Sequence, residues 1–213
     1  MNAARESIWQ ALLARALAIL DDAVAHGMPD DWSFGGGTVL MLRHRHRFSK
    51  DIDIFVPDEQ CLGFLTPRLN DRAETGMTDY VEQRGSIKIY YPEGEVDFVA
   101  AAALMPAPFE ESEILGRRLK VERSEEIVGK KVLYRAREFK ARDIFDLALV
   151  LEREPAATAA LLPLLRAKGA ALLERLARHD AALREDFEQI DALDYRPDYE
   201  YCRELIRHTL GKP

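Results

Sequence analysis

The C-terminal part of the chain constrains the fold most, because it contains helical patterns and no strand pattern. From Ser124 onward, apolar residues recur at the three- and four-residue spacing of amphipathic helices. Ser124 is a suitable helix cap, and Glu125 and Glu126 after it suit the positive end of a helix dipole. The spacing predicts helices at about 125–139, 141–153, 156–177 and 197–209.

The N-terminal part mixes helical and strand patterns. Helices are expected at 4–26, from 39 onward, and at 58–72 with a break near Pro67. Strand alternation is found at 51–56, in a meander at 80–84, 87–91 and 95–99, and in a small hairpin around Gly116. The sequence therefore predicts an α+β fold, in which a sheet domain at residues 1–122 precedes an all-helical domain at residues 123–213.

Charge and composition limit the location and the partners of the protein. The net charge is −7 at pH 7, so any polyanion must be bound by a local basic patch. Cys61 and Cys202 match no metal-binding spacing and are interpreted as reduced thiols. No apolar run approaches the roughly 20 residues of a membrane span, and the first 25 residues carry charges that a signal peptide lacks. We expect a cytoplasmic protein without a membrane partner.

The pattern with most chemical content joins a glycine run to a pair of acids. Gly35, Gly36, Gly37 and Thr38 are followed, after eleven residues, by Lys50-Asp51-Ile52-Asp53. In a strand, Ile52 and Ile54 would enter the core while Asp51 and Asp53 share the opposite face. Two such close carboxylates favour a bound cation, Mg²⁺ or Mn²⁺. Glycines before a helix leave backbone N–H groups open to a phosphate.

A third acid, Asp97, alternates with Val96 and Phe98 in the meander. If its strand lies beside 51–56, Asp97 completes a triad able to hold two metal ions. Between the glycine run and the acid pair lie basic side chains that a triphosphate would need: Arg43, Arg45, Arg47 and Lys50. His44 and His46 would not face each other on a helix, so solvent or phosphate contact is favoured over metal binding.

Two motifs resemble a known family. The Gly-Gly-Gly-Thr run followed by Ser49-Lys50-Asp51-Ile52-Asp53 resembles the signature of DNA polymerase β-like nucleotidyltransferases. The segment Glu126-Ile-Val-Gly-Lys-Lys131, with the later Arg142-Asp143-Ile-Phe-Asp146-Leu, resembles motifs of the AbiEii/AbiGii nucleotidyltransferase toxins. The resemblance covers roughly residues 33–150.

The resemblance implies a nucleotidyltransferase-type mixed sheet and a set of site residues. Asp51 and Asp53 match the metal carboxylates, Lys131 (or Lys130) the lysine that meets nucleotide phosphates, and Asp143 a late acid that acts as base or metal partner. Gly36, Gly37 and Ser49 match phosphate-loop positions, and Thr38 and Lys50 are expected beside them as further nucleotide-binding residues.

The activity that the resemblance implies is metal-dependent transfer of an NMP from an NTP to a hydroxyl. RNA, such as a tRNA end, is the expected acceptor, and a cognate antitoxin is the expected protein partner of such a toxin.

Other interpretations remain open from the sequence. The acid pair could be a solvated strand face, the glycine run a helix-entry turn, and Lys131 a lysine at a core edge. Asp143 and Asp146 could pair within a helix bundle. The protein could also act on a protein or small molecule, or be a non-catalytic binding module. Intact metal acids argue against that last alternative.

Overall fold

The computed structural model describes residues 3–211, with side chains from residue 7 onward, and forms two compact units. We call the first the sheet unit; it comprises Met1–Leu42, Ser49–Ala103 and Phe109–Glu122. We call the second the helical unit; it comprises Arg43–Phe48, Leu104–Pro108 and Arg123–Pro213. The second unit therefore takes two short segments from within the N-terminal part of the chain.

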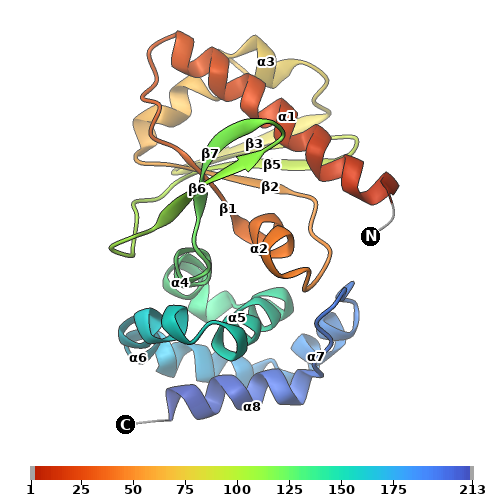
Figure 1. Cartoon of the computed structure of the whole chain (residues 1–213), viewed down its shortest axis with the longest axis vertical. Coiled ribbons are helices and arrows are strands. Elements are labelled where there is room, and N and C mark those ends of the chain that lie inside the picture. The colour runs from red at the N-terminus through yellow and green to blue at the C-terminus, as the bar shows by residue number, and fades with distance from the viewer. Residues whose placement is uncertain (1–2, 212–213) are drawn as a thin grey trace. The chain divides into compact units, whose positions relative to one another are not determined.

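The sheet unit contains a mixed seven-stranded sheet in the order β3-β4-β5-β2-β1-β7-β6 (Figure 1). Pairs β2–β5 and β1–β7 are parallel, and the others are antiparallel. The bounds are β1 (Ser33–Gly35), β2 (Ile52–Val56), β3 (Asp79–Gln83), β4 (Ser86–Tyr91), β5 (Gly94–Ala100), β6 (Phe109–Ile114) and β7 (Arg117–Glu122). The predicted meander (β3, β4 and β5) and hairpin (β6 and β7) are confirmed. The parallel pairing of β2 with β5 also meets the condition that the sequence analysis set for Asp97.

Helices cover this sheet. Helix α1 (Ala3–Ala25) packs against β2 and β5, and α2 (Gly36–His44) begins directly after β1. The predicted helix at 58–72 is wrong: the segment holds a 3₁₀ turn, η1 (Glu59–Phe64), and only the first residues of the short α3 (Asp71–Glu74). Asp58 and Asn70 each accept a bond from a backbone N–H further along, and such local bonds compete with a continuous helix.

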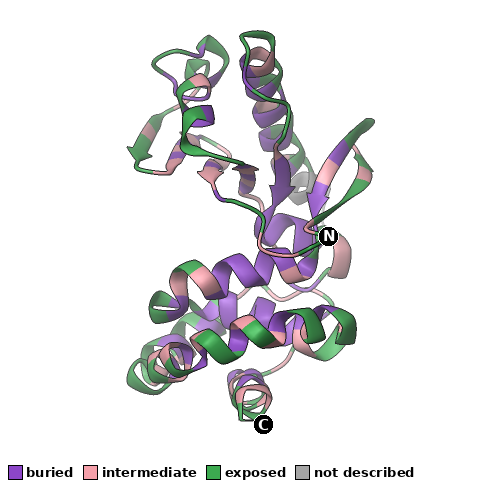
Figure 2. Ribbon diagram, turned by 90° about the vertical axis from the view of Figure 1, so that its left-hand side faces the viewer, coloured by how far each residue is buried: buried purple, intermediate pink, exposed green. Residues whose placement is uncertain are grey.

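The helical unit is built from α4 (Ser124–Arg135), η2 (Ala136–Glu138), α5 (Ala141–Arg153), α6 (Pro155–Arg178), α7 (Asp180–Glu188) and α8 (Tyr199–Leu210). Helix α5 is the most enclosed, and residues Ile144 to Val150 are all buried (Figure 2). Two details differ from expectation. Helix α7, which buries only Leu183 and Phe187, is not among the predicted helices. Ser124 makes no cap, since its hydroxyl instead accepts a hydrogen bond from Arg43.

Helix α6 is long and apolar enough, by length and composition only, to meet the criterion for a membrane span. The sequence analysis did not expect such a segment. One such helix is weak evidence for a membrane span, because core helices of other proteins meet the same criterion. In this helix, 28% of the most apolar window is buried. Its buried stripe, which includes Leu161, Leu165 and Leu172, packs within the helical unit, where α6 contacts α4, α5 and α8.

Candidate active site

The predicted acid pair lies at the start of the central strand β2. Ile52, Ile54 and Val56 are buried, while Asp53 between them is on the opposite, half-exposed face. The predicted alternation is therefore confirmed. Asp51 directly precedes the strand, and its carboxylate accepts a hydrogen bond from the backbone N–H of Glu95 at 3.4 Å.

Asp97 lies beside Asp53, because the two residues are direct partners in the parallel pair of β2 and β5. Neighbouring strands are about 4.8 Å apart, so these two carboxylates share one small area of the sheet. Burial raises the pKa of the Asp97 carboxyl above its usual value, and the nearby charges of Glu95 and Asp51 act in the same direction. Asp97 is thus the register partner of Asp53 and lies within the electrostatic influence of Asp51.

The glycine run lies against the same carboxylates. Gly35 is the antiparallel partner of Asp53, and Gly36 follows with a φ of +72°. A Cβ atom at Gly36 would stand 1.9 Å from Asp53 Oδ2. Only glycine permits both this left-handed conformation and this close approach. The backbone before α2 is therefore in direct contact with the acid site.

Hydrogen bonds of Thr38 hold the backbone beside the acid site in place, with Ser49 next to it. The buried Thr38 hydroxyl donates to the backbone oxygen of Asp51 at 2.6 Å and lies 3.2 Å from the Ser49 hydroxyl. Lys50 donates to the backbone oxygen of Glu93 at 2.8 Å. These bonds fix the backbone at Asp51, and direct nucleotide contact by these residues stays a prediction.

Gly36→Ala should destabilise the protein and reduce its activity more than Gly116→Ala. Both glycines have a φ of +72°, but a Cβ at Gly116 meets nothing within 4 Å. Both substitutions therefore carry the free-energy cost of a left-handed alanine. The difference between their losses in unfolding free energy measures the clash with Asp53. We expect an additional loss of about 1–3 kcal/mol, typical of overpacking. Urea unfolding of both variants measures it, and equal losses would mean that Asp53 moves away from Gly36 freely.

Lys88 is a residue of this face that is not among the predicted site residues. Lys88 is the antiparallel partner of Asp97, and its ammonium donates to Asp97 Oδ2 at 2.7 Å and to Glu95. Although burial disfavours its charge, these two carboxylates hold the pKa of Lys88 above its usual value. The strict alternation with the buried Ile87 and Ile89 could have identified it, because it predicts Lys88 on the face that carries Asp97.

The donor set at this face fits a divalent metal in chemistry. Carboxylate oxygens are the ligands that Mg²⁺ and Mn²⁺ prefer; Asp53 and Asp97 lie on adjacent strands, and Asp51 directly precedes β2. Within residues 3–211, however, no three His, Cys, Asp or Glu side chains converge into a ready metal site. Lys88 already binds Glu95 and Oδ2 of Asp97, so a metal ion at Asp97 would either use Oδ1 or displace this ammonium.

The second predicted motif forms a buried ionic cluster in the helical unit. Asp146 on α5 accepts hydrogen bonds from Lys131 Nζ at 2.6 Å and from Arg47 Nε and Nη2 at 2.7 and 2.8 Å. His46 Nε2 lies 2.9 Å from the same carboxylate. Lys131 also donates to Asp143 at 3.0 Å. We call these five residues the Asp146 cluster. Burial opposes the charge of Asp146, yet Arg47 and Lys131 hold its pKa well below the usual value.

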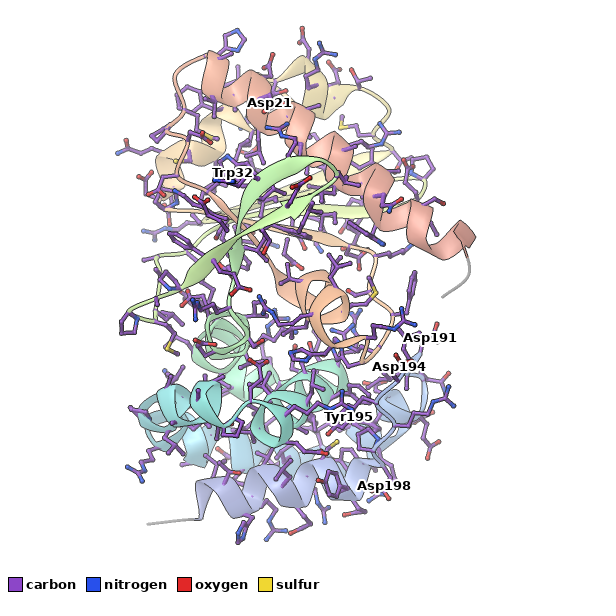
Figure 3. All side chains as sticks on the ribbon, in the orientation of Figure 1. Asp21, Trp32, Asp191, Asp194, Tyr195 and Asp198 are labelled. Atoms are coloured by element: carbon purple, nitrogen blue, oxygen red, sulfur yellow. The ribbon has the colours of Figure 1, made fainter. Side chains whose placement is uncertain are left out.

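Two expectations for the basic segment 43–47 are corrected by these contacts. His46 and Arg47 are buried, so they do not contact solvent or phosphate, and His44 pairs with Glu154 at 2.7 Å. The segment is held by backbone hydrogen bonds to residues 191–194, which include Asp191 and Asp194 labelled in Figure 3. Arg45 pairs with Asp194 at 2.8 Å. This long-range pairing leaves no periodic signal in the sequence.

The two adjacent lysines of α4 have different partners. Lys130 Nζ lies 3.2 Å from Glu126, whose carboxylate accepts the backbone N–H groups of Leu104 and Met105. Lys131 belongs to the Asp146 cluster. The two side chains point apart because one residue turns a helix by about 100°. A nucleotide contact by either lysine, and a catalytic role for Asp143, stay predictions.

His46 should make the stability of the protein fall as the pH drops below about 6.5. Burial lowers the pKa of His46 below its usual value, against the opposing effect of Asp146. The unfolded chain then binds a proton that the folded protein does not, and stability decreases with decreasing pH. Urea unfolding between pH 7.5 and 5 should show a smaller decrease for His46→Phe. Replacing the exposed His26 with Phe should leave the wild-type profile, and equal profiles for all three proteins would contradict the assignment.

Solved structures of other proteins align with this chain at low sequence identity. The antibiotic-resistance factor ANT(2'')-Ia has a similar fold, with a TM-score of 0.52 and 19% identity over 80% of this chain and 99% of that one. JHP933 from Helicobacter pylori aligns with a TM-score of 0.45 and 16% identity over 95% of this chain and 90% of that one. A search of curated proteins finds no match.

The sheet order and the glycine turn beside the acids match the nucleotidyltransferase-type arrangement that the sequence predicts. The model of one family, described as the nucleotidyl transferase AbiEii toxin of type IV toxin–antitoxin systems, matches residues 18–208. The chain belongs to this AbiEii family and is a nucleotidyltransferase enzyme, which implies an NTP as its substrate.

Proposed function

We propose that this protein transfers an NMP from an NTP to a hydroxyl group of RNA, such as a tRNA end. The observation that carries the proposal is the register of Asp53 with Asp97, directly beside Gly36. Acids on adjacent strands next to a glycine turn provide what phosphoryl chemistry needs, namely oxygen ligands and backbone N–H groups within one area.

Asp51, Asp53 and Asp97 would hold Mg²⁺ or Mn²⁺. A metal ion bound there would lower the pKa of the acceptor hydroxyl and neutralise charge on the phosphates. Gly36 and Gly37 would present backbone N–H groups to the phosphates, with Ser49 and Lys50 beside them. Thr38, which binds the backbone of Asp51, would keep that acid in position.

Lys131 and Asp143 are proposed as further members of the site, with residues 123–213 as the helical domain that completes the active-site cleft. The match of their motif to the AbiEii family supports this assignment. Since Lys131 binds Asp143 and Asp146, its ammonium would have to exchange a carboxylate for a phosphate oxygen.

The biological role that we propose is that of the toxin in a toxin–antitoxin or abortive-infection system, acting in the cytoplasm with a cognate antitoxin. The family description supports the toxin–antitoxin context. The two cysteines, Cys61 and Cys202, are buried free thiols, as is usual in a reducing compartment.

A second candidate acceptor is a small molecule. The fold match to ANT(2'')-Ia favours it, since that protein has been crystallised with adenylyl-2''-tobramycin. A non-catalytic binding role is the third alternative, and the intact acids disfavour it.

The test is to incubate the protein with each α-labelled NTP, in Mg²⁺ or in EDTA, with total cellular RNA, a protein lysate or an aminoglycoside. We expect one NTP to label RNA in the presence of Mg²⁺ only. Label on the protein or aminoglycoside alone would replace RNA as the acceptor. No label with any acceptor would refute the proposal.

A further inference from the structure

A small cavity of about 130 Å³ in the helical unit is surrounded mainly by basic side chains. Its lining comes from η2 and from the end of α6: Arg137, Ala171, Glu174, Arg175, Arg178 and His179. We call it the η2–α6 pocket. It shares no residue with the Asp146 cluster or with the acidic face of the sheet unit.

The basic groups of this pocket are only partly neutralised. Glu174 provides the one carboxylate in the lining, and it pairs with Arg178 at 3.0 Å. Arg175 Nε donates to the backbone oxygen of Phe139 at 3.1 Å, and this bond fixes its guanidinium. Among the residues that the structure describes, no carboxylate lies within ion-pair distance of Arg137 or Arg175. The pocket therefore has an excess of positive charge.

Charge is also distributed unevenly between the units. By sequence, the sheet unit contains 20 acidic and 10 basic residues, whereas the helical unit contains 17 acidic and 20 basic residues. A polyanionic acceptor is repelled by the first and not by the second. A binding site for such an acceptor is thus expected in the helical unit.

We propose that the η2–α6 pocket binds a backbone phosphate of the RNA acceptor. This inference rests on the proposed function. The pocket has room for a single oxyanion together with water. Three arginines line the pocket, and guanidinium groups suit the several oxygens of a phosphate through their paired N–H donors.

The competing explanation is that these residues only stabilise the C-terminal end of α6. Arg175, Arg178 and His179 lie at the negative end of that helix, where cations are favourable. Arg137 decides between the two, because it belongs to η2 and makes no side-chain hydrogen bond or ion pair within the described part of the chain. Its loss should not affect α6, but it should weaken phosphate binding.

The experiment measures the affinity of full-length Asp53→Asn protein for fluorescent tRNA by anisotropy at several salt concentrations. The disabled acid site prevents turnover. Arg137→Ala and Arg137→Ala/Arg175→Ala are compared with Arg207→Ala, whose arginine lies on α8 of the same unit and pairs with Glu204 as Arg178 does with Glu174. Thermal unfolding verifies that each variant is folded.

We expect Arg137→Ala to weaken binding severalfold and the double variant about tenfold. The slope of log K against log salt should fall by roughly 0.7–0.9 for each lost contact. Arg207→Ala should change neither quantity. Unchanged affinity and slope for Arg137→Ala would overturn the inference.

Two further arms identify the ligand. Inorganic phosphate should compete with RNA for the wild-type pocket and not for the double variant. If the variants lose binding to a poly-glutamate peptide but keep binding to RNA, the pocket serves an acidic protein partner and the inference is wrong. Transfer of label to RNA by the wild-type protein is scored separately, so a failed pocket and a failed function are distinguishable.

Discussion

Asp53→Asn should reduce nucleotidyl transfer by roughly a thousandfold or more, while the protein remains folded. Asp53 stands at the centre of the candidate site, beside Asp97 and against Gly36. The amide keeps the shape of the side chain but removes the charge that a divalent cation needs. A loss of about 4 kcal/mol in transition-state stabilisation corresponds to this factor.

The stability of Asp53→Asn should equal or slightly exceed that of the wild type, because the substitution relieves repulsion between neighbouring carboxylates. Transfer from labelled NTP, Mn²⁺ binding followed by electron paramagnetic resonance, and urea unfolding measure the three properties. Asp79→Asn on the edge strand β3 is the matched control and should leave transfer unchanged. A wild-type rate for Asp53→Asn would refute a metal-binding role for this residue.

Asp146→Ala should be the most destabilising single change in the helical unit. Removing this carboxylate leaves the buried Arg47 and Lys131 without their shared counter-ion. Breaking a buried ion pair in this way typically costs about 3–5 kcal/mol. Asp180→Ala is the control, because its ion pairs with Arg203 and Arg184 lie near the surface and such pairs contribute about 0–1 kcal/mol.

Urea unfolding of both variants gives the comparison. The same experiment informs the proposed role of Lys131. Lys131→Met, measured beside Asp146→Ala, removes the 3.0 Å partner of the buried Asp143 and should also be destabilising. If Lys131 contacts the nucleotide, this variant should also lose transfer in the fraction of protein that remains folded. Equal stability losses for Asp146→Ala and Asp180→Ala would contradict the buried cluster.

The elements with regular spacing could be predicted from sequence. The alternation of Ile52 and Ile54 placed Asp53 on the correct face, and the three strands from 79 to 100 followed from alternation and turn residues. Helices α4, α5, α6 and α8 followed from periodicity. In each case local spacing and burial agree, so a pattern within a few residues determines the structure.

The remaining parts depend on distant residues. Helix α7 has only Leu183 and Phe187 to mark its buried face, too few for a periodic signal. Residues 43–47 looked like a basic surface, because nothing in their own sequence indicates that Asp146 lies a hundred positions later. The alternation in β4 predicts the face of the sheet on which Lys88 lies. Its ion pair with Asp97 could not be predicted, because it depends on the register of β4 with β5.

The chain passes between its two units repeatedly, since Arg43–Phe48 and Leu104–Pro108 belong to the helical unit. No single cut can therefore release either unit intact. A fragment starting at Arg123 would keep Lys131 beside Asp146 but lose Arg47 and His46, and it would lose the backbone N–H groups that Glu126 binds. Exchange of whole domains between relatives should fail for the same reason, so recombination within this family is expected to preserve the chain as one inherited block.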